Sequence, residues 1–165
     1  MEMIKLLPLL ELLENNKKVE QDPKWHPEGN AYNHSVQCFE LAMKNSQDMD
    51  VILAALFHDL GKQKESHGHE QHSYYMCKNY LSTKSLWLIK NHMRINYLLS
   101  GKMKKANKIA SLRDNPWFNE LLELNVYDKM ARMKDYYYHF DFVNSPIMKA
   151  LNEKLKNYEP LREEK

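Results

Sequence analysis

The chain has 165 residues, of which 43% are hydrophobic and 28% charged, and its formal net charge is +2. This composition excludes an intrinsically disordered chain and is typical of a soluble globular domain. No apolar run approaches the roughly 20 residues that span a bilayer, so we expect no membrane partner. Residues 1–8 carry no basic leader with a small-residue cleavage site, and we therefore expect a cytoplasmic protein.

Helices are expected nearly throughout, because only four glycines occur and apolar residues recur at three- and four-residue spacing. The predicted fold class is therefore all-α, with helices over residues 3–16, 33–46, 49–60, 69–81, 83–96, 103–113, 117–139 and 145–157. Loops are expected at residues 22–30, 66–68 and 115–116, where proline, glycine and asparagine gather. Without repeats or linkers, we expect one domain over residues 1–165, with a core at about 20–140 and flanking terminal helices.

The expected helix at residues 49–60 ends in an unusual way. Residues 51–57 are apolar on every side, which indicates a helix buried in the middle of the protein. It runs into His58 and Asp59, and we expect Gly61 to follow the helix end in a left-handed conformation. The Asp59 carboxylate would then face the negative end of the helix dipole, away from water, which is unfavourable without a positive partner. A divalent metal ion or the nearby Lys62 could supply that charge.

Three other polar residues, His34, His92 and Asp128, lie on apolar helix faces. A single buried histidine is commonly a hydrogen-bonded core residue, but an aspartate is almost never buried without a partner. Together with His58 and Asp59, they predict one metal site to which several helices each contribute a ligand.

The order of these residues along the chain resembles the HD superfamily of metal-dependent phosphohydrolases. The string at residues 56–62, Leu-Phe-His-Asp-Leu-Gly-Lys, carries most of this resemblance. The segments at residues 21–35, 68–70, 92–94 and 127–129 are similar, in the same order, to the HD domain of bacterial tRNA nucleotidyltransferases (CCA-adding enzymes). These 165 residues contain no Gly-Ser followed by the paired catalytic aspartates of the nucleotidyltransferase head, so the resemblance does not imply CCA addition. Asn30, where that family commonly has Asp, is a small departure in the loop before His34.

The resemblance implies an HD-domain helical bundle with a divalent transition metal among the central helices. It assigns the first ion to His34, His58, Asp59 and Asp128. Two-metal members of the superfamily imply a second ion at His69 and His92, bridged by Asp59, with His72 as an alternative to His69. Histidine and carboxylate ligands suit Mn, Fe, Ni, Co or Zn.

Catalysis of phosphoester hydrolysis also needs positive charge around the phosphoryl oxygens. We expect Lys62 to supply it, with Arg94 and Arg132 as further candidates, although each of the three could be a solvated surface charge. Glu70 is a candidate proton shuttle or hydrogen-bond partner of a ligand histidine. His26 is expected to be a loop residue with a substrate contact.

Two further features have alternative interpretations. Lysines 102, 104, 105 and 108 with Arg113, preceded by Lys90 and Arg94, form either a solvated helix face or a surface for a phosphate-bearing ligand. Tyr136, Tyr137, Tyr138, Phe140 and Phe142 could stack on a nucleobase, but at helical spacing core packing is the better interpretation.

The predicted function is a metal-dependent phosphohydrolase whose partner is a nucleotide or RNA-end phosphoester, such as a 2′,3′-cyclic phosphodiesterase or phosphatase. Hydrolysis of nucleoside mono- or triphosphates is the alternative within the same chemistry. A non-catalytic nucleotide-binding HD module is the alternative of another class. A purely structural metal is disfavoured, since closed structural zinc sites prefer thiolates. The oligomeric state is left open by the sequence.

Overall fold

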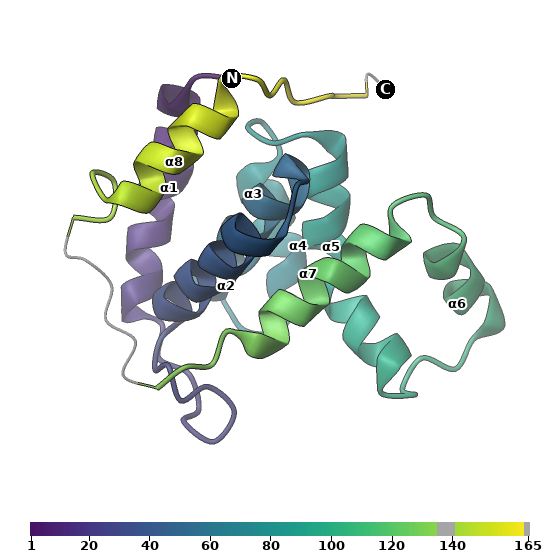
Figure 1. Cartoon of the computed structure of the whole chain (residues 1–165). Coiled ribbons are helices and arrows are strands. Elements are labelled where there is room, and N and C mark those ends of the chain that lie inside the picture. Colours follow the sequence, from purple (N-terminus) through teal and green to yellow (C-terminus); the bar gives the residue numbers. More distant parts are fainter. Residues whose placement is uncertain (135–140, 164–165) are drawn as a thin grey trace.

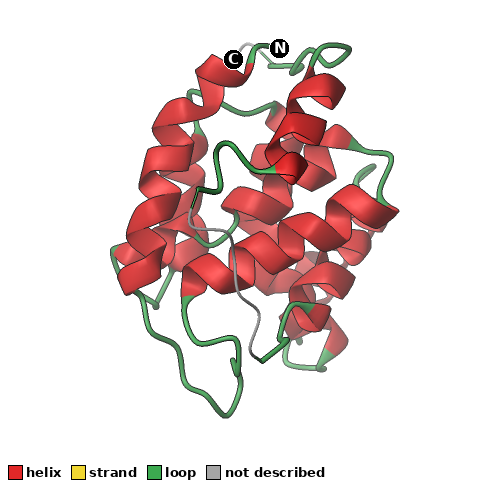
Figure 2. Cartoon of the chain, turned by 60° about the vertical axis from the view of Figure 1, so that its left-hand side comes forward, coloured by secondary structure: helices red, strands yellow, loops and turns green. Residues whose placement is uncertain are grey.

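The computed structural model describes residues 1–134 and 141–163 and contains helices but no strand within these ranges (Figure 2). The α-helices are α1 (Leu7–Asn15), α2 (Ala31–Asn45), α3 (Met49–Phe57), α4 (His69–Cys77), α5 (Thr83–Leu99), α6 (Ala106–Arg113), α7 (Phe118–Met130) and α8 (Pro146–Leu155). Short 3-10 helices lie at η1 (Met3–Leu6), η2 (Asn16–Lys18) and η3 (Leu60–Gln63). The predicted all-α fold is confirmed. None of the described helices is long and apolar enough to cross a membrane.

Helix α3 is the centre of the core. Each of its residues from Val51 to Phe57 is 0% exposed, as expected for a helix that is apolar on all sides. The Asp48 carboxylate caps its first turn by accepting hydrogen bonds from the N–H groups of Asp50 and Val51. Helices α2, α5 and α7 pack against it (Figure 1), and Phe57, the last residue of α3, is fully buried among them.

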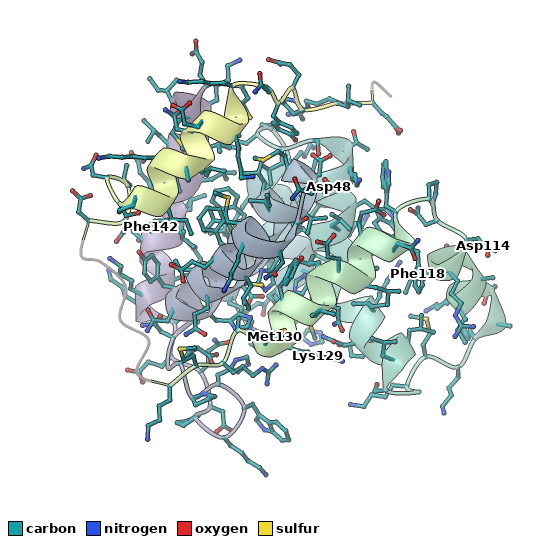
Figure 3. All side chains as sticks on the ribbon, viewed as in Figure 1. Asp48, Asp114, Phe118, Lys129, Met130 and Phe142 are labelled. Atoms are coloured by element: carbon teal, nitrogen blue, oxygen red, sulfur yellow. The ribbon has the colours of Figure 1, made fainter. Side chains whose placement is uncertain are left out.

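The helix predicted at residues 117–139 is shorter than expected, because α7 ends at Met130 (Figure 3). Ala131 has φ −79° and ψ 60°, and the Arg132 N–H bonds to the Met130 carbonyl, which is the geometry of an inverse γ-turn. The Gln37 side chain then accepts from the Met133 N–H and donates to the Met133 carbonyl, at 2.9 and 3.0 Å. Helix α2 therefore supplies the hydrogen bonds that another turn of α7 would have made.

Several other helix boundaries differ from those expected by three or four residues. The helix predicted at residues 49–60 stops at Phe57; His58 and Asp59 form a turn, and Leu60 begins the separate 3-10 helix η3. Helix α4 is shorter than predicted, ending at Cys77, and α5 continues to Leu99.

The loop before α2 is held closed at its base. The Gln21 N–H donates to the Gly29 carbonyl and the Ala31 N–H to the Val19 carbonyl, each at 2.9 Å. Asn30 is the N-cap of α2 and accepts from the Asn33 N–H at 2.8 Å. Since Asn and Asp are about equally good N-caps, the departure at residue 30 leaves this capping intact.

Helices α1 and α8 are at the same edge of the bundle in the view of Figure 1. Phe142, just before α8, is 2% exposed and packs edge-on against Tyr32 and Phe39 of α2. The packing role predicted for this aromatic residue is confirmed. Tyr136, Tyr137, Tyr138 and Phe140 lie outside the described residues.

Candidate metal centre

The imidazole of His34 is oriented by the turn that ends α7. Its Nδ1 donates to the carbonyl oxygen of Ala131 at 2.9 Å. Because a carbonyl oxygen only accepts, the hydrogen is fixed on Nδ1 and Nε2 is left to face the carboxylates. Nε2 lies 2.7 Å from Asp128 Oδ1 and 3.7 Å from Asp59 Oδ2. The shortened α7 thus positions both a histidine of α2 and its own Asp128.

His58 and Asp59 follow directly after the buried helix α3. The Nδ1 of His58 donates to the Ala55 carbonyl at 2.8 Å, and its Nε2 points toward the same carboxylates. That Nε2 lies 3.4 Å from Asp59 Oδ2 and 3.3 Å from Asp128 Oδ1. The backbone carbonyl of Asp59 accepts a hydrogen bond from Asn16 at 3.1 Å, which fixes the aspartate from the opposite side.

Gly61 differs from the prediction. It lies within η3 and is not among the glycines with positive φ, so the expected left-handed conformation is wrong. A Cβ on Gly61 would instead lie 2.1 Å from the His69 carbonyl oxygen and 2.6 Å from the Ser73 nitrogen. The Gly61 N–H donates to Ser73 Oγ at 2.8 Å. Glycine is needed here because α4 packs directly against this backbone.

His69 and His92 are oriented in the same way as the first two histidines. Their Nδ1 atoms donate to the carbonyls of Ser66 and Ile89, at 2.9 and 2.6 Å. Their Nε2 atoms lie 3.0 Å from each other, and 3.1 and 3.5 Å from Asp59 Oδ1. Asp59 is therefore placed between two pairs of histidines, with a different carboxylate oxygen facing each pair.

These six side chains, His34, His58, Asp59, His69, His92 and Asp128, are named here the His/Asp cluster. Their donor atoms form two groups close enough to hold a cation, because within each group all ligand atoms lie within 4.8 Å of one another. One group is His34, His58 and Asp128, and the other is His58, Asp59 and His92. The buried Nε2 of His58 has no hydrogen-bond partner among the described residues. Nitrogen and carboxylate ligands fit a divalent transition metal, whose identity the donor set does not select.

Without a metal, protons take the place of the cation. Burial lowers the pKa of the His34 imidazole, but Asp128 and Glu28 outweigh it and raise this pKa to about 9. Burial likewise disfavours the charged His58, yet Asp59 and Asp128 raise its pKa to about 10. Burial alone would raise the pKa of the Asp59 carboxyl, but His58 and Lys62 hold it well below its usual range. The carboxylates of the cluster therefore stabilise positive charge among them, whether it is carried by protons or by a metal ion.

A cavity of about 680 Å³ opens over the His/Asp cluster, and Asp59, His69, His92 and Asp128 line it. Lys62 and Arg132 line the same cavity. The Lys62 ammonium lies 3.3 Å from Asp59 Oδ2 and donates to the Gln21 side chain at 2.6 Å. Both cations are thus within the same cavity as the cluster.

The remaining predicted site residues are distributed differently. Glu70 lines the cavity, and its carboxylate lies 3.9 Å from His69 Nδ1. Arg94 lies outside this cavity and lines two neighbouring ones along α5 and α6. His72 pairs with Glu65 at 2.9 Å, whereas His69 is in the cluster. His67 is exposed at the cavity rim.

Glu28 is a residue that the sequence reasoning did not single out. Its side chain is 0% exposed, accepts from His26 Nδ1 at 2.6 Å and lies 3.6 Å from His34 Nδ1. His26 lines the cavity and packs edge-on against the His34 ring. Burial would raise the pKa of Glu28, but hydrogen bonds with the two histidines lower it. The sequence did offer a hint of this pair, since Glu28 lies only two residues after His26.

The family model named HD domain matches residues 31–132, well over half of the chain. The chain belongs to the HD domain family. HD domains are typically metal-dependent hydrolases, so the match implies a phosphohydrolase-type activity in general terms. The predicted superfamily is therefore confirmed, while the nearer likeness to tRNA nucleotidyltransferases stays a prediction.

Proposed function

We propose that this chain hydrolyses phosphoesters of nucleotides or RNA ends with a divalent transition metal bound by His34, His58, Asp59 and Asp128. A second ion would be held by His69, His92 and the other oxygen of Asp59. The observation that carries the proposal is the position of Asp59 between two pairs of Nε2 atoms, beneath an open cavity. A structural metal site would have no need of that cavity.

When bound, the metal lowers the pKa of a coordinated water and neutralises phosphoryl oxygens. The protein contributes orientation, since carbonyl oxygens hold each histidine ring and keep Nε2 directed at the carboxylates. Lys62 provides a cation beside Asp59 for an equatorial phosphoryl oxygen.

Arg132 is a second phosphate contact in this proposal. It donates to the Trp25 carbonyl at 2.7 Å, while its buried Nε has no hydrogen-bond partner among the described residues. Because Arg132 lines the cavity, its guanidinium is placed to donate to a phosphoryl oxygen there. Glu70 is placed to exchange protons at the cavity wall, beside His69.

Hydrolysis of free nucleoside mono- or triphosphates is the second candidate. The observation that favours it is the cavity itself, because about 680 Å³ is a volume typical of small-molecule sites.

The test incubates metal-stripped protein with 2′,3′-cyclic AMP, then adds Mn or Ni and separates the products by chromatography. We expect ring opening that depends on added metal and is lost in Asp59→Ala. Glu11→Ala, which removes an exposed carboxylate on α1, is the matched control and should behave as wild type. Turnover of nucleoside mono- or triphosphates alone would favour the second candidate. No turnover and no retained metal would leave the non-catalytic binding module as the better account.

A further inference from the structure

The surface beside the His/Asp cluster carries a second feature that hydrolysis of a small phosphoester does not need. A cavity of about 460 Å³ lies between α4, α5 and α6, and its lining has six cations and one carboxylate. The cations are Lys90, Arg94, Lys102, Lys104, Lys105 and Lys108, and the carboxylate is Glu70. We name this surface the basic groove.

The basic groove is continuous with the cavity over the cluster. Glu70 and Tyr97 line both. On the far side, Lys90, Arg94 and Lys108 also line a third cavity, of about 360 Å³. From Tyr97 back to Lys90 the surface extends about 10 Å along α5, at 1.5 Å per residue. This path is longer than one terminal phosphate requires.

The charge of the groove is not balanced within the protein. No ion pair among the described residues involves any of its six cations. Lys102, Lys104, Lys105 and Lys108 are exposed, and α6 begins beside them without a side-chain cap. A protein tolerates such a concentration of like charge at a cost, which a polyanion would relieve.

An aromatic ring stands where the two cavities join. Tyr97 is 41% exposed although it is a large aromatic residue of a packed helix. Cations along a groove with an exposed aromatic ring are the combination that binds single-stranded nucleic acid, because the cations follow the backbone and the ring stacks on a base.

We propose that the basic groove binds the phosphodiester backbone of single-stranded RNA whose terminal phosphoester lies at the His/Asp cluster. Tyr97 stacks on a base near that end, and the cations of α5, of α6 and of the segment between them contact the phosphates that follow. This inference rests on the proposed function and narrows its substrate class from nucleotides in general to RNA ends.

Binding tests the proposal without requiring turnover. A fluorescein-labelled single-stranded RNA of about ten nucleotides, ending in a 2′,3′-cyclic phosphate, is titrated with Asp59→Asn protein by anisotropy at several salt concentrations. In that background we compare Lys102→Gln/Lys104→Gln/Lys105→Gln with a control, Lys5→Gln/Lys44→Gln/Lys149→Gln. The control removes three exposed lysines that lie outside these cavities and keeps the net charge equal.

The groove variant should lower the slope of log affinity against log salt by about two, since each neutralised phosphate contributes about 0.7 for single strands. The control should keep the parent slope. Tyr97→Leu should weaken binding about tenfold, the effect of losing one stacked base. Equal slopes in the two lysine variants would overturn the proposal, as would competition by ATP as strong as that by unlabelled RNA.

Turnover separates failure of the inference from failure of the function. With active protein, the ratio of kcat/KM for the RNA to that for 2′,3′-cyclic AMP should fall about tenfold in the groove variant and stay constant in the control. If 2′,3′-cyclic AMP is hydrolysed but the groove lysines do not affect this ratio, RNA binding by the groove is refuted while the proposed function stands. Groove-dependent binding without hydrolysis of any substrate would refute the proposed function and leave the groove as a binding surface.

Discussion

The His/Asp cluster and the basic groove are neighbours along α5, but they are built in opposite ways. In the cluster, buried imidazoles are each fixed by a backbone carbonyl, as His92 is by Ile89. In the groove, exposed lysines have no ion-pair partner among the described residues. Fixed geometry suits bond cleavage, which tolerates little displacement of the reacting atoms. Exposed, unpaired cations suit a backbone that repeats the same charge along its length.

The largest expected effect divides these two regions. Asp59→Asn keeps the size of the side chain but removes the charge that faces both pairs of histidines, so we expect kcat to fall about a thousandfold or more. The slope of log RNA affinity against log salt should stay that of the wild type, because the groove lysines do not contact Asp59. Metal content by atomic spectroscopy, kcat with 2′,3′-cyclic AMP and RNA anisotropy are the measurements. A fall in both kcat and the salt dependence of RNA binding would show that the two regions are not independent.

Rigidity of the cluster is tested at Gly61. Gly61→Ala places a methyl group against the backbone of His69 and Ser73, and should lower the free energy of unfolding by about 3 kcal/mol. Gly101→Ala, at φ +77° with open space around it, is the control and should cost about 1 kcal/mol. Denaturant unfolding measures both. An equal loss of unfolding free energy in the two variants would contradict the close approach of α4 to Gly61.

The two halves of the cluster should also be separable. His92→Ala removes a donor from the side of Asp59 Oδ1, and we expect bound metal to fall by about half and kcat about a hundredfold. His34→Ala removes a donor from the Oδ2 side, together with its bond to Ala131, and should abolish tight metal binding. Metal content and isothermal titration distinguish the outcomes. Full metal retention in His92→Ala would show that His92 is not needed to hold an ion.

The smallest expected effect is on pH dependence. Because His34 and His58 have pKa values raised from 6.5 to about 9 and about 10, their protonation stabilises the metal-free fold at low pH. That stabilisation is complete below pH 6.5 and is lost as the pH rises through about 9 and 10. A bound metal must displace these protons, so its affinity should increase at least about tenfold per pH unit above neutrality. Calorimetry in buffers of different ionisation enthalpy counts the released protons. An affinity independent of pH would mean that the imidazoles are already neutral.

The same contrast explains what the sequence allowed us to predict. His58 and Asp59 could be singled out because polar residues beside the apolar helix 51–57 need a compensating charge. The lysines of the groove could not be assigned, since unpaired surface charge is common and its neighbours in space are unknown from sequence. The end of α7 was missed because Gln37, distant in sequence, supplies the hydrogen bonds at Met133. Gly61 was recognised as special for the wrong reason, because contact with α4 is tertiary information.

The carbonyl oxygens that orient the four histidines have an implication for genetics. They belong to the backbone of Ala55, Ser66, Ile89 and Ala131, so no change of side chain at these positions removes an acceptor. Alanine scanning would not remove these acceptors, and at the buried Ile89 it would report only the loss of packing. A one-residue insertion or deletion between Asp128 and Ala131, in contrast, would turn the His34 ring away without altering any ligand. For the geometry of this site, the spacing of the chain between Asp128 and Ala131 therefore matters as much as the histidines themselves.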